Sequence, residues 1–154
     1  MSRYVVLLNE EVAPELRAKA ARCLASMLKD RAARPVLEVY GEPPLCWFAS
    51  RETAERAGID VVGRDITTPR PLPEGNVLYG MMSEKSGAVW LSAEQKVDRI
   101  GHTLAHELGH LARAAYDADP VTQRAVKGWH KADTNEHEQS AKAMERLLRR
   151  HQYA

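Results

Sequence analysis

The chain has 154 residues, of which 44% are hydrophobic and 28% are charged, and 22 basic residues against 21 acidic ones give a formal charge of +1. This length fits a single domain spanning residues 1–154, with the composition of an ordinary globular protein. The near-zero net charge gives no indication of nucleic acid or an anionic membrane as a partner. The longest apolar run near the N-terminus, Tyr4 to Leu8, is too short for a signal-peptide core or a membrane span, so we expect a cytoplasmic protein.

The N-terminal part of the chain is predicted to form a strand followed by a long helix. Residues 3–9 (RYVVLLN) are apolar and rich in β-prone types, which favours a strand. A helical pattern opens at Pro14 and is broken by Pro35. The apolar stripe of this helix comprises Leu16, Ala20, Cys23, Leu24, Met27 and Leu28.

Two further strands and one short helix are predicted before residue 67. Residues 36–40 and 59–62 are short β-prone runs, each expected to form a strand. Between them, Ser50 is a candidate N-cap for a helix over residues 51–57, because its hydroxyl can accept a hydrogen bond from a free amide of the first turn. The prolines within residues 67–75 favour an extended connector.

The second half of the chain is predicted to contain a hairpin followed by a long helix. The β-prone runs 76–82 and 88–91 are separated by a short polar stretch, so we expect them to pair antiparallel. Residues 92–95 (SAEQ) have the form of a capping box, which predicts a helix from near Ala93 to about Tyr116.

The last helix is predicted to start at Asp133 or Thr134, either of which can cap it, and to end near Arg150. A shorter helical stretch is expected between these two helices, ending before Gly128. The stripe expected to be buried on the last helix comprises Ala141, Met144, Leu147 and Leu148. These elements predict an α+β fold, in which a small mixed or antiparallel sheet packs against the two helices.

His106, Glu107 and His110 form a His-Glu-x-x-His run within the first of these two helices. Positions i and i+4 share one helical face, so both imidazoles can bind one zinc ion while Glu107 lies beside it. A catalytic zinc needs three protein ligands and one open position for water. Glu107 can then take a proton from that water and return it to the leaving amine.

The third ligand is predicted to be Glu138, at the start of the last helix. Its Glu-x-x-Ala step puts the small Ala141 one turn on, which would let the two helices approach closely. Glu136 is the main alternative as third ligand; its other possible role is to complete a capping box with Asp133. His137 is a weaker one, since its side chain would point about 100° away from Glu138.

The cysteines do not contribute to this site. Cys23 and Cys46 lack the CxxC spacing of a metal or redox centre, and buried free thiols are expected. The metal ligands must therefore come from histidine and carboxylate.

Four residues are candidates for a further donor to the developing oxyanion, and their spacing does not choose among them: His130, Tyr116, Tyr79 and His102. His102 lies one turn before His106 and is more simply explained as a helix histidine than as a fourth ligand. The strand over residues 88–91 precedes the metal helix, and its free edge could hold an extended peptide by main-chain pairing. A peptide or protein is therefore the expected substrate class.

Residues 87–92 (GAVWLS) and 99–111 (RIGHTLAHELGHL) resemble the ImmA/IrrE family of metallopeptidases. That family is similar in its strand leading into a TLAHELGH helix and in a later helix with a Glu-x-x-Ala step. The resemblance implies a zincin-like fold of the gluzincin type. It implies Zn²⁺ bound by His106, His110 and Glu138, with Glu107 as the catalytic carboxylate.

The resemblance extends over residues 75–148, about half of the chain, and it implies a regulatory protein as one possible substrate. The leading hypothesis is a zinc metallopeptidase that hydrolyses a peptide bond in a specific protein. The alternative is a non-catalytic, metal-stabilised interaction module. No helix-turn-helix pattern supports direct binding of nucleic acid, and the role of residues 1–70 and the oligomeric state stay open.

Overall fold

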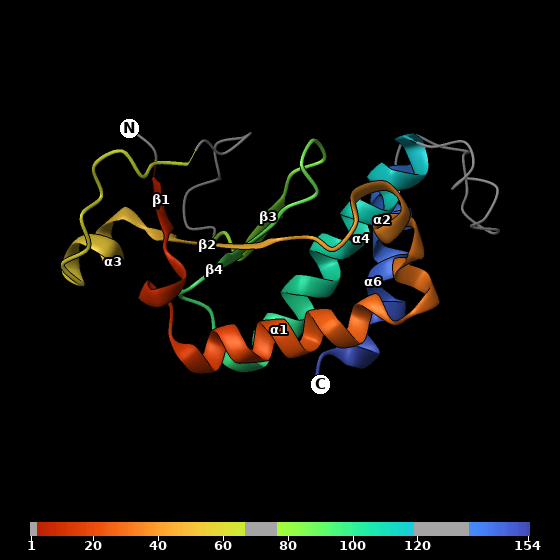
Figure 1. The fold of residues 1–154 in the computed structure, drawn as a ribbon, viewed down its shortest axis with the longest axis horizontal. Coiled ribbons are helices and arrows are strands. Elements are labelled where there is room, and N and C mark those ends of the chain that lie inside the picture. Colours follow the sequence, from red (N-terminus) through yellow and green to blue (C-terminus); the bar gives the residue numbers. More distant parts are fainter. Residues whose placement is uncertain (1–2, 67–76, 119–135) are drawn as a thin grey trace.

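A computed structural model describes residues 3–66, 77–118 and 136–154, the first five residues of the last range by their backbone alone. The described chain is a mixed α+β fold built on a four-stranded sheet (Figure 1). The strands are β1 (Tyr4–Leu7), β2 (Leu45–Ser50), β3 (Gly80–Met82) and β4 (Val89–Ser92). The helices are α1 (Pro14–Leu28), α2 (Arg34–Tyr40), α3 (Arg51–Arg56), α4 (Ile100–Ala118) and α6 (Glu136–Leu148). Short 3-10 helices are η1 (Asn9–Glu11), η2 (Arg31–Ala33), η3 (Val97–Arg99) and η4 (Arg149–His151).

The sheet has the strand order β1-β2-β4-β3. β1 is antiparallel to β2, β2 is parallel to β4, and β3 is antiparallel to β4, so the predicted hairpin is confirmed. The prediction of a free edge on the strand over residues 88–91 is wrong, because β4 is paired on both sides. Among the described strands, only β4 pairs with β3, so β3 is the edge strand next to α4.

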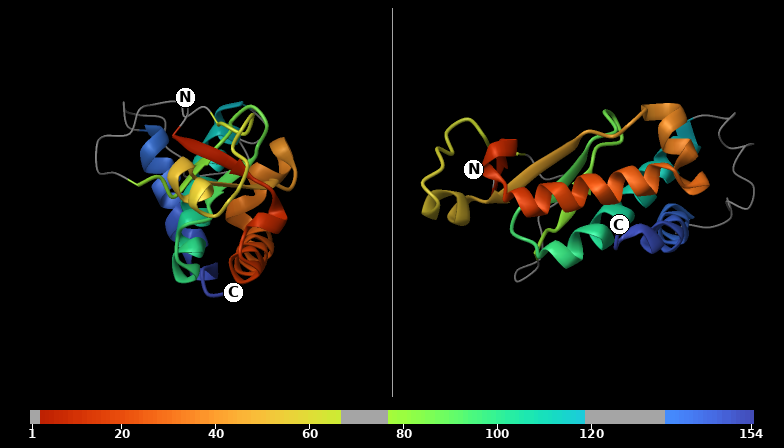
Figure 2. Two further views of the ribbon diagram at one scale, coloured as in Figure 1. Left: turned by 90° about the vertical axis from the view of Figure 1, so that its left-hand side faces the viewer. Right: turned by 60° about the horizontal axis from the view of Figure 1, so that its bottom comes forward.

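Helices α1, α2 and α4 pack together over one face of the sheet (Figure 2). Side chains alternate across a strand, so Trp47 and Ala49 of β2 point into this main core while Phe48 points to the opposite face. The predicted stripe of α1 is buried at Leu16, Ala20, Cys23, Leu24 and Met27. It faces a continuous apolar stripe of α4 comprising Ile100, Leu104, Leu108 and Leu111.

The structure corrects two predictions in the first half of the chain and adds one strand. Residues 36–40 belong to helix α2, because Pro35 occupies its first turn, where the missing N–H costs nothing, and Val36 is buried. Residues 45–50 form β2, a strand that the sequence interpretation missed. Residues 59–62 form no strand, and the chain there turns at Gly63. The short helix after Ser50 is confirmed, with the Ser50 hydroxyl accepting from the Thr53 amide.

The predicted helix start at Ala93 is also wrong, since α4 begins at Ile100 after η3. Ser92 is held in β4 by its pairing with β2, and its amide donates to the Tyr79 carbonyl. The side-chain amide nitrogen of Gln95 donates to the carbonyls of Tyr79 and Ser92. Its side-chain oxygen accepts from the Thr103 hydroxyl at 2.7 Å. Gln95 therefore ties β3 to α4 instead of completing a capping box.

Helices α4 and α6 run antiparallel in close contact, on the right of Figure 1. A Cβ at Gly109 would lie 2.3 Å from the Ala141 carbonyl oxygen, and one at Gly101 would lie 2.6 Å from the Gln152 Cα. The close approach predicted at Ala141 is thus confirmed. Leu147 is half exposed, contrary to the predicted stripe, while Ala141, Met144 and Leu148 are buried.

The C-terminal residues lie beside α1, where the Lys19 ammonium donates to the Ala154 carbonyl. Cys23 is buried and Cys46 is half buried, and both thiols are free. The predicted helix before Gly128 and the caps at Asp133 and Thr134 lie outside the described residues. Among the described helices, none combines the length and the apolar character that crossing a membrane requires.

Candidate metal site on helix α4

One ring nitrogen of His106 lies close to one ring nitrogen of His110 on α4. Their Nε2 atoms are 3.2 Å apart, and the two rings are nearly perpendicular. Two nitrogens bound about 2.0–2.1 Å from one tetrahedral ion stand roughly 3.3–3.4 Å apart. The i, i+4 spacing therefore provides a pair of donors at the separation that a zinc ion requires.

Glu145 of α6 fixes the orientation of His106. The His106 Nδ1–H donates to Glu145 Oε2 at 3.0 Å, which leaves Nε2 as the nitrogen that faces His110. The Glu145 side chain is only 12% exposed, so its carboxylate acts in a partly desolvated setting where a charged hydrogen bond is strong. Histidine ligands of metals commonly donate their second N–H to such a carboxylate.

The sequence interpretation missed Glu145. It lies on the same helix as the predicted ligand Glu138, and the two positions are seven residues apart, close to two helical turns. A signal was present, because a lone carboxylate interrupts the buried stripe between Met144 and Leu148. Only the antiparallel register of α4 and α6 shows which histidine it meets.

His102 contacts the same carboxylate from the preceding turn of α4, with Nε2 at 3.5 Å from Glu145 Oε1. Burial lowers the pKa of His102, the Glu145 charge opposes this, and the positive charges of Arg149 and Arg99 lower it further. These effects together favour the neutral imidazole. Its contact with Glu145 agrees with the interpretation of His102 as a helix histidine.

Glu107 lies beneath the edge strand β3. Its side chain is buried, with 6% of the residue exposed, and its Cγ would be 3.2 Å from a Cβ placed on Gly80. The same Cβ would be 2.7 Å from Thr103 Cγ2. Glycine at position 80 thus lets the strand lie directly on α4 beside the predicted catalytic carboxylate.

The other three candidate donors to the developing oxyanion lie in different parts of the chain. Tyr79 precedes β3, and its ring is stacked with the Arg99 guanidinium at 3.8 Å. Tyr116 is buried, two turns beyond the histidine pair, with Arg113 over its ring. His130 lies outside the described residues.

The predicted third ligand is described by its backbone only. Glu136 and Glu138 stand in the first turn of α6, and their side chains, like that of His137, are outside the described residues. Within the part of the chain whose side chains are described, no three His, Cys, Asp or Glu groups are placed to hold one ion. The described side chains therefore supply two converging nitrogen donors and a carboxylate that orients one of them.

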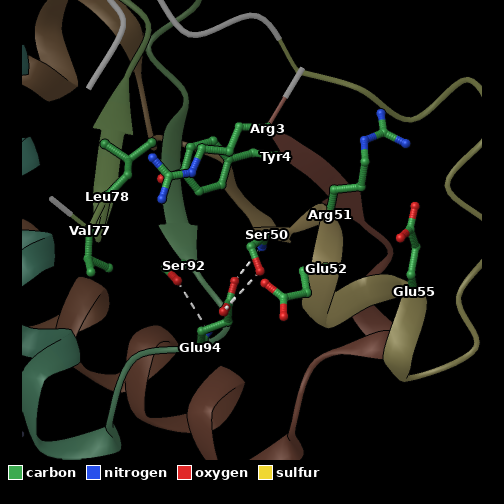
Figure 3. Close-up of a pocket in the computed structure, with 10 residues that line it drawn as sticks. All are labelled: Arg3, Tyr4, Ser50, Arg51, Glu52, Glu55, Val77, Leu78, Ser92 and Glu94. Carbon is green, nitrogen blue, oxygen red and sulfur yellow. Dashed lines mark hydrogen bonds between the residues drawn. The ribbon is translucent and has the colours of Figure 1, made fainter. Parts of the chain in front are cut away.

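A cavity of about 520 Å³ opens elsewhere, at the ends of β2 and β4 where α3 begins (Figure 3). Its lining includes neither histidine of the pair. Glu94 accepts hydrogen bonds there from the Ser50 amide, the Ser50 hydroxyl and the Thr53 hydroxyl, so it supports the start of α3. Because Glu94 and Ser50 already stabilise the start of α3, this cavity is not the candidate site.

The chain was compared with protein-family models, with curated proteins and with solved structures, and none of the three comparisons found a match.

Proposed function

We propose that the chain is a zinc-dependent metallopeptidase with a zincin-like active site on α4. The observation that carries this proposal is the 3.2 Å approach of the Nε2 atoms of His106 and His110, together with the His106–Glu145 hydrogen bond. A simple surface histidine pair has no need of a buried carboxylate to fix the ring tautomer. A metal site does, because only one nitrogen of each ring can face the ion.

Glu138 is the third ligand in this proposal. The contacts Gly109–Ala141 and His106–Glu145 set an antiparallel register between the helices. Continuing that register by one turn brings position 138 level with residues 112 and 113, within one turn of His110. Three protein ligands would leave the fourth position open to water, as hydrolysis requires.

Bound zinc would supply a water molecule with a pKa near 7 and would polarise the scissile carbonyl. Glu107 holds the proton taken from that water and delivers it to the leaving amine. Its burial beneath β3 favours this role, because it holds the carboxylate away from bulk water. Glu145 holds His106 in one tautomer throughout.

The substrate in this proposal is an extended peptide added to the outer side of β3. Peptides bind exposed sheet edges by main-chain hydrogen bonds, which place every second side chain toward the protein. β3 is short, and Gly80 brings it against the catalytic face of α4. A peptide paired with β3 would thus pass directly beside Glu107.

The test begins with the metal. Purified protein is expected to contain one zinc per chain, and removal of zinc by a chelator is expected to lower the melting temperature. His106→Ala should abolish zinc binding. His151→Ala, which changes a histidine on η4, should leave zinc binding intact. Protein that contains no zinc, and that added zinc does not stabilise, would contradict the proposal.

Catalysis is tested by comparing cells that express the native chain with cells that express Glu107→Gln. A protein shortened only by the native chain is the expected result, with zinc retained in both forms. Zinc binding without any such product would instead favour the non-catalytic interaction module, in which the metal only stabilises the packing of α4 and α6.

A further inference from the structure

The guanidinium of Arg99 is held in place at one end of the proposed site. Arg99 ends η3, directly before α4, and its Cζ lies 3.8 Å from the centre of the Tyr79 ring. Stacking on an aromatic face restrains the guanidinium plane and leaves its N–H edge available. Tyr79 is itself fixed, because its carbonyl accepts from the Gln95 side chain and the Ser92 amide.

Arg99 lies on the same side of the helix as the histidine pair. Positions 102, 106 and 110 follow one face of α4, and Arg99, in the turn just before this helix, continues the same spacing of three or four residues. Tyr79 directly precedes Gly80, which contacts Thr103 and Glu107. The stacked guanidinium therefore stands where β3 begins and in line with the metal-binding face.

The guanidinium of Arg99 makes a cation–π contact with Tyr79 but no ion pair within the described part of the chain. The residue is exposed, and no described carboxylate forms an ion pair with it. Arg149 adds a second positive charge near His102, which both arginines influence. This end of the site therefore carries two arginines, while the Glu145 carboxylate is engaged by His102 and His106.

We infer that Arg99, held by Tyr79, binds a carboxylate of the peptide substrate and so determines where the chain is cut. This inference rests on the proposed peptidase function. Seven residues separate Arg99 from His106, which corresponds to about 10 Å along a helix. An extended peptide covers that distance in about three residues. The carboxylate, from an acidic side chain or from the C-terminus, is thus about three residues from the cleaved bond.

The first experiment maps cleavage by the zinc-loaded chain in a mixed pool of synthetic decapeptides, and in the same pool with amidated C-termini. We expect cleavage sites with a carboxylate about three residues away on one side. Loss of the preference on amidation assigns it to the terminus, and its retention assigns it to Asp or Glu. If neither pool is cut by the native chain, this inference is overturned, whereas the proposed function is judged by the cell comparison with Glu107→Gln described above.

The second experiment uses a single cleaved peptide with Asp, Asn or Lys at the mapped position; for a terminal carboxylate, free and amidated forms replace Asp and Asn. The native chain should favour the carboxylate by roughly 1.5- to five-fold in KM, the range for an exposed charge pair. Arg99→Gln should remove this preference and Arg99→Glu should shift it toward Lys or toward the amide. Arg31→Gln, which removes an exposed arginine on η2, is the matched control and should keep it.

Tyr79 variants separate stacking from any role of its hydroxyl group. Tyr79→Phe should retain the carboxylate preference, and Tyr79→Leu should weaken it. The preference should also decrease as salt is raised, because the pair is exposed. Cleavage by the native chain with no carboxylate preference, or with one that Arg99→Gln leaves unchanged, would overturn the inference while the peptidase function stands.

Discussion

Gly109→Ala is the sharpest test of how α6 completes the site. The added Cβ would lie 2.3 Å from the Ala141 carbonyl oxygen, whereas Cβ atoms in proteins essentially never come within 3.0 Å of such a neighbour. The helices must therefore separate by about 0.7 Å, the difference between these two distances. The obstacle is backbone, so no side-chain rotation can relieve it.

Two effects on stability oppose each other in this variant. Alanine in place of glycine favours a helix by about 0.5–1 kcal/mol. Overpacking a tight contact costs about 1–3 kcal/mol. We expect the second to dominate, so that the free energy of unfolding in urea falls by about 0.5–2 kcal/mol. The same separation lengthens the His106–Glu145 hydrogen bond, so zinc affinity should fall as well.

The matched control is Gly58→Ala. Gly58 has a φ of 75°, and a Cβ added there would have no atom within 4 Å, so the substitution costs about 1 kcal/mol of backbone strain without touching α4 or α6. The free energy of unfolding of the Gly58→Ala protein should fall by a similar amount, while its zinc affinity in a chelator competition should equal that of the native chain. A Gly109→Ala protein that is as stable as the native chain, with unchanged zinc affinity, would refute the proposed helix contact.

Three further outcomes are expected. Glu145→Ala should weaken zinc binding by about 10- to 100-fold in the chelator competition, whereas Arg146→Ala, at an exposed neighbouring position, should not. Gly80→Ala should lower kcat/KM by at least about ten-fold with zinc content unchanged, because its Cβ would push β3 away from Thr103 and Glu107; native kinetics would disprove that contact. Burial by itself raises the pKa of Asp30, but the Ala32 amide, His151 and Arg150 together lower it. The ionised Asp30 carboxylate should therefore stabilise the fold above the unfolded pKa of about 3.9, and this stabilisation should be lost as the pH falls through the folded pKa. The urea unfolding midpoints of the native chain and of Asp30→Asn should converge only at low pH.

Local signals in the sequence predicted elements wherever the deciding interactions lie within a few residues. The Ser50 cap and the β3–β4 hairpin belong to this group, as does the apolar stripe of α1. The wrong predictions involve long-range partners. Residues 36–40 are β-prone, yet they form α2 because one face of that helix is buried against α4. Residues 92–95 match a capping box, but pairing of β4 with β2 holds Ser92 in the sheet.

The features of the candidate site also divide into those set by local sequence and those set by long-range contacts. The sequence by itself determined that His106 and His110 share a face and that Glu107 stands beside them, because the period of an α-helix fixes this locally. Only the tertiary structure decided that Glu145 orients His106, and that β3 rather than β4 is the edge strand over Glu107. It also brought Tyr79 against Arg99. These contacts join segments separated by as many as 39 positions, and their register is set by the packing of α4, α6 and the sheet rather than by any local pattern.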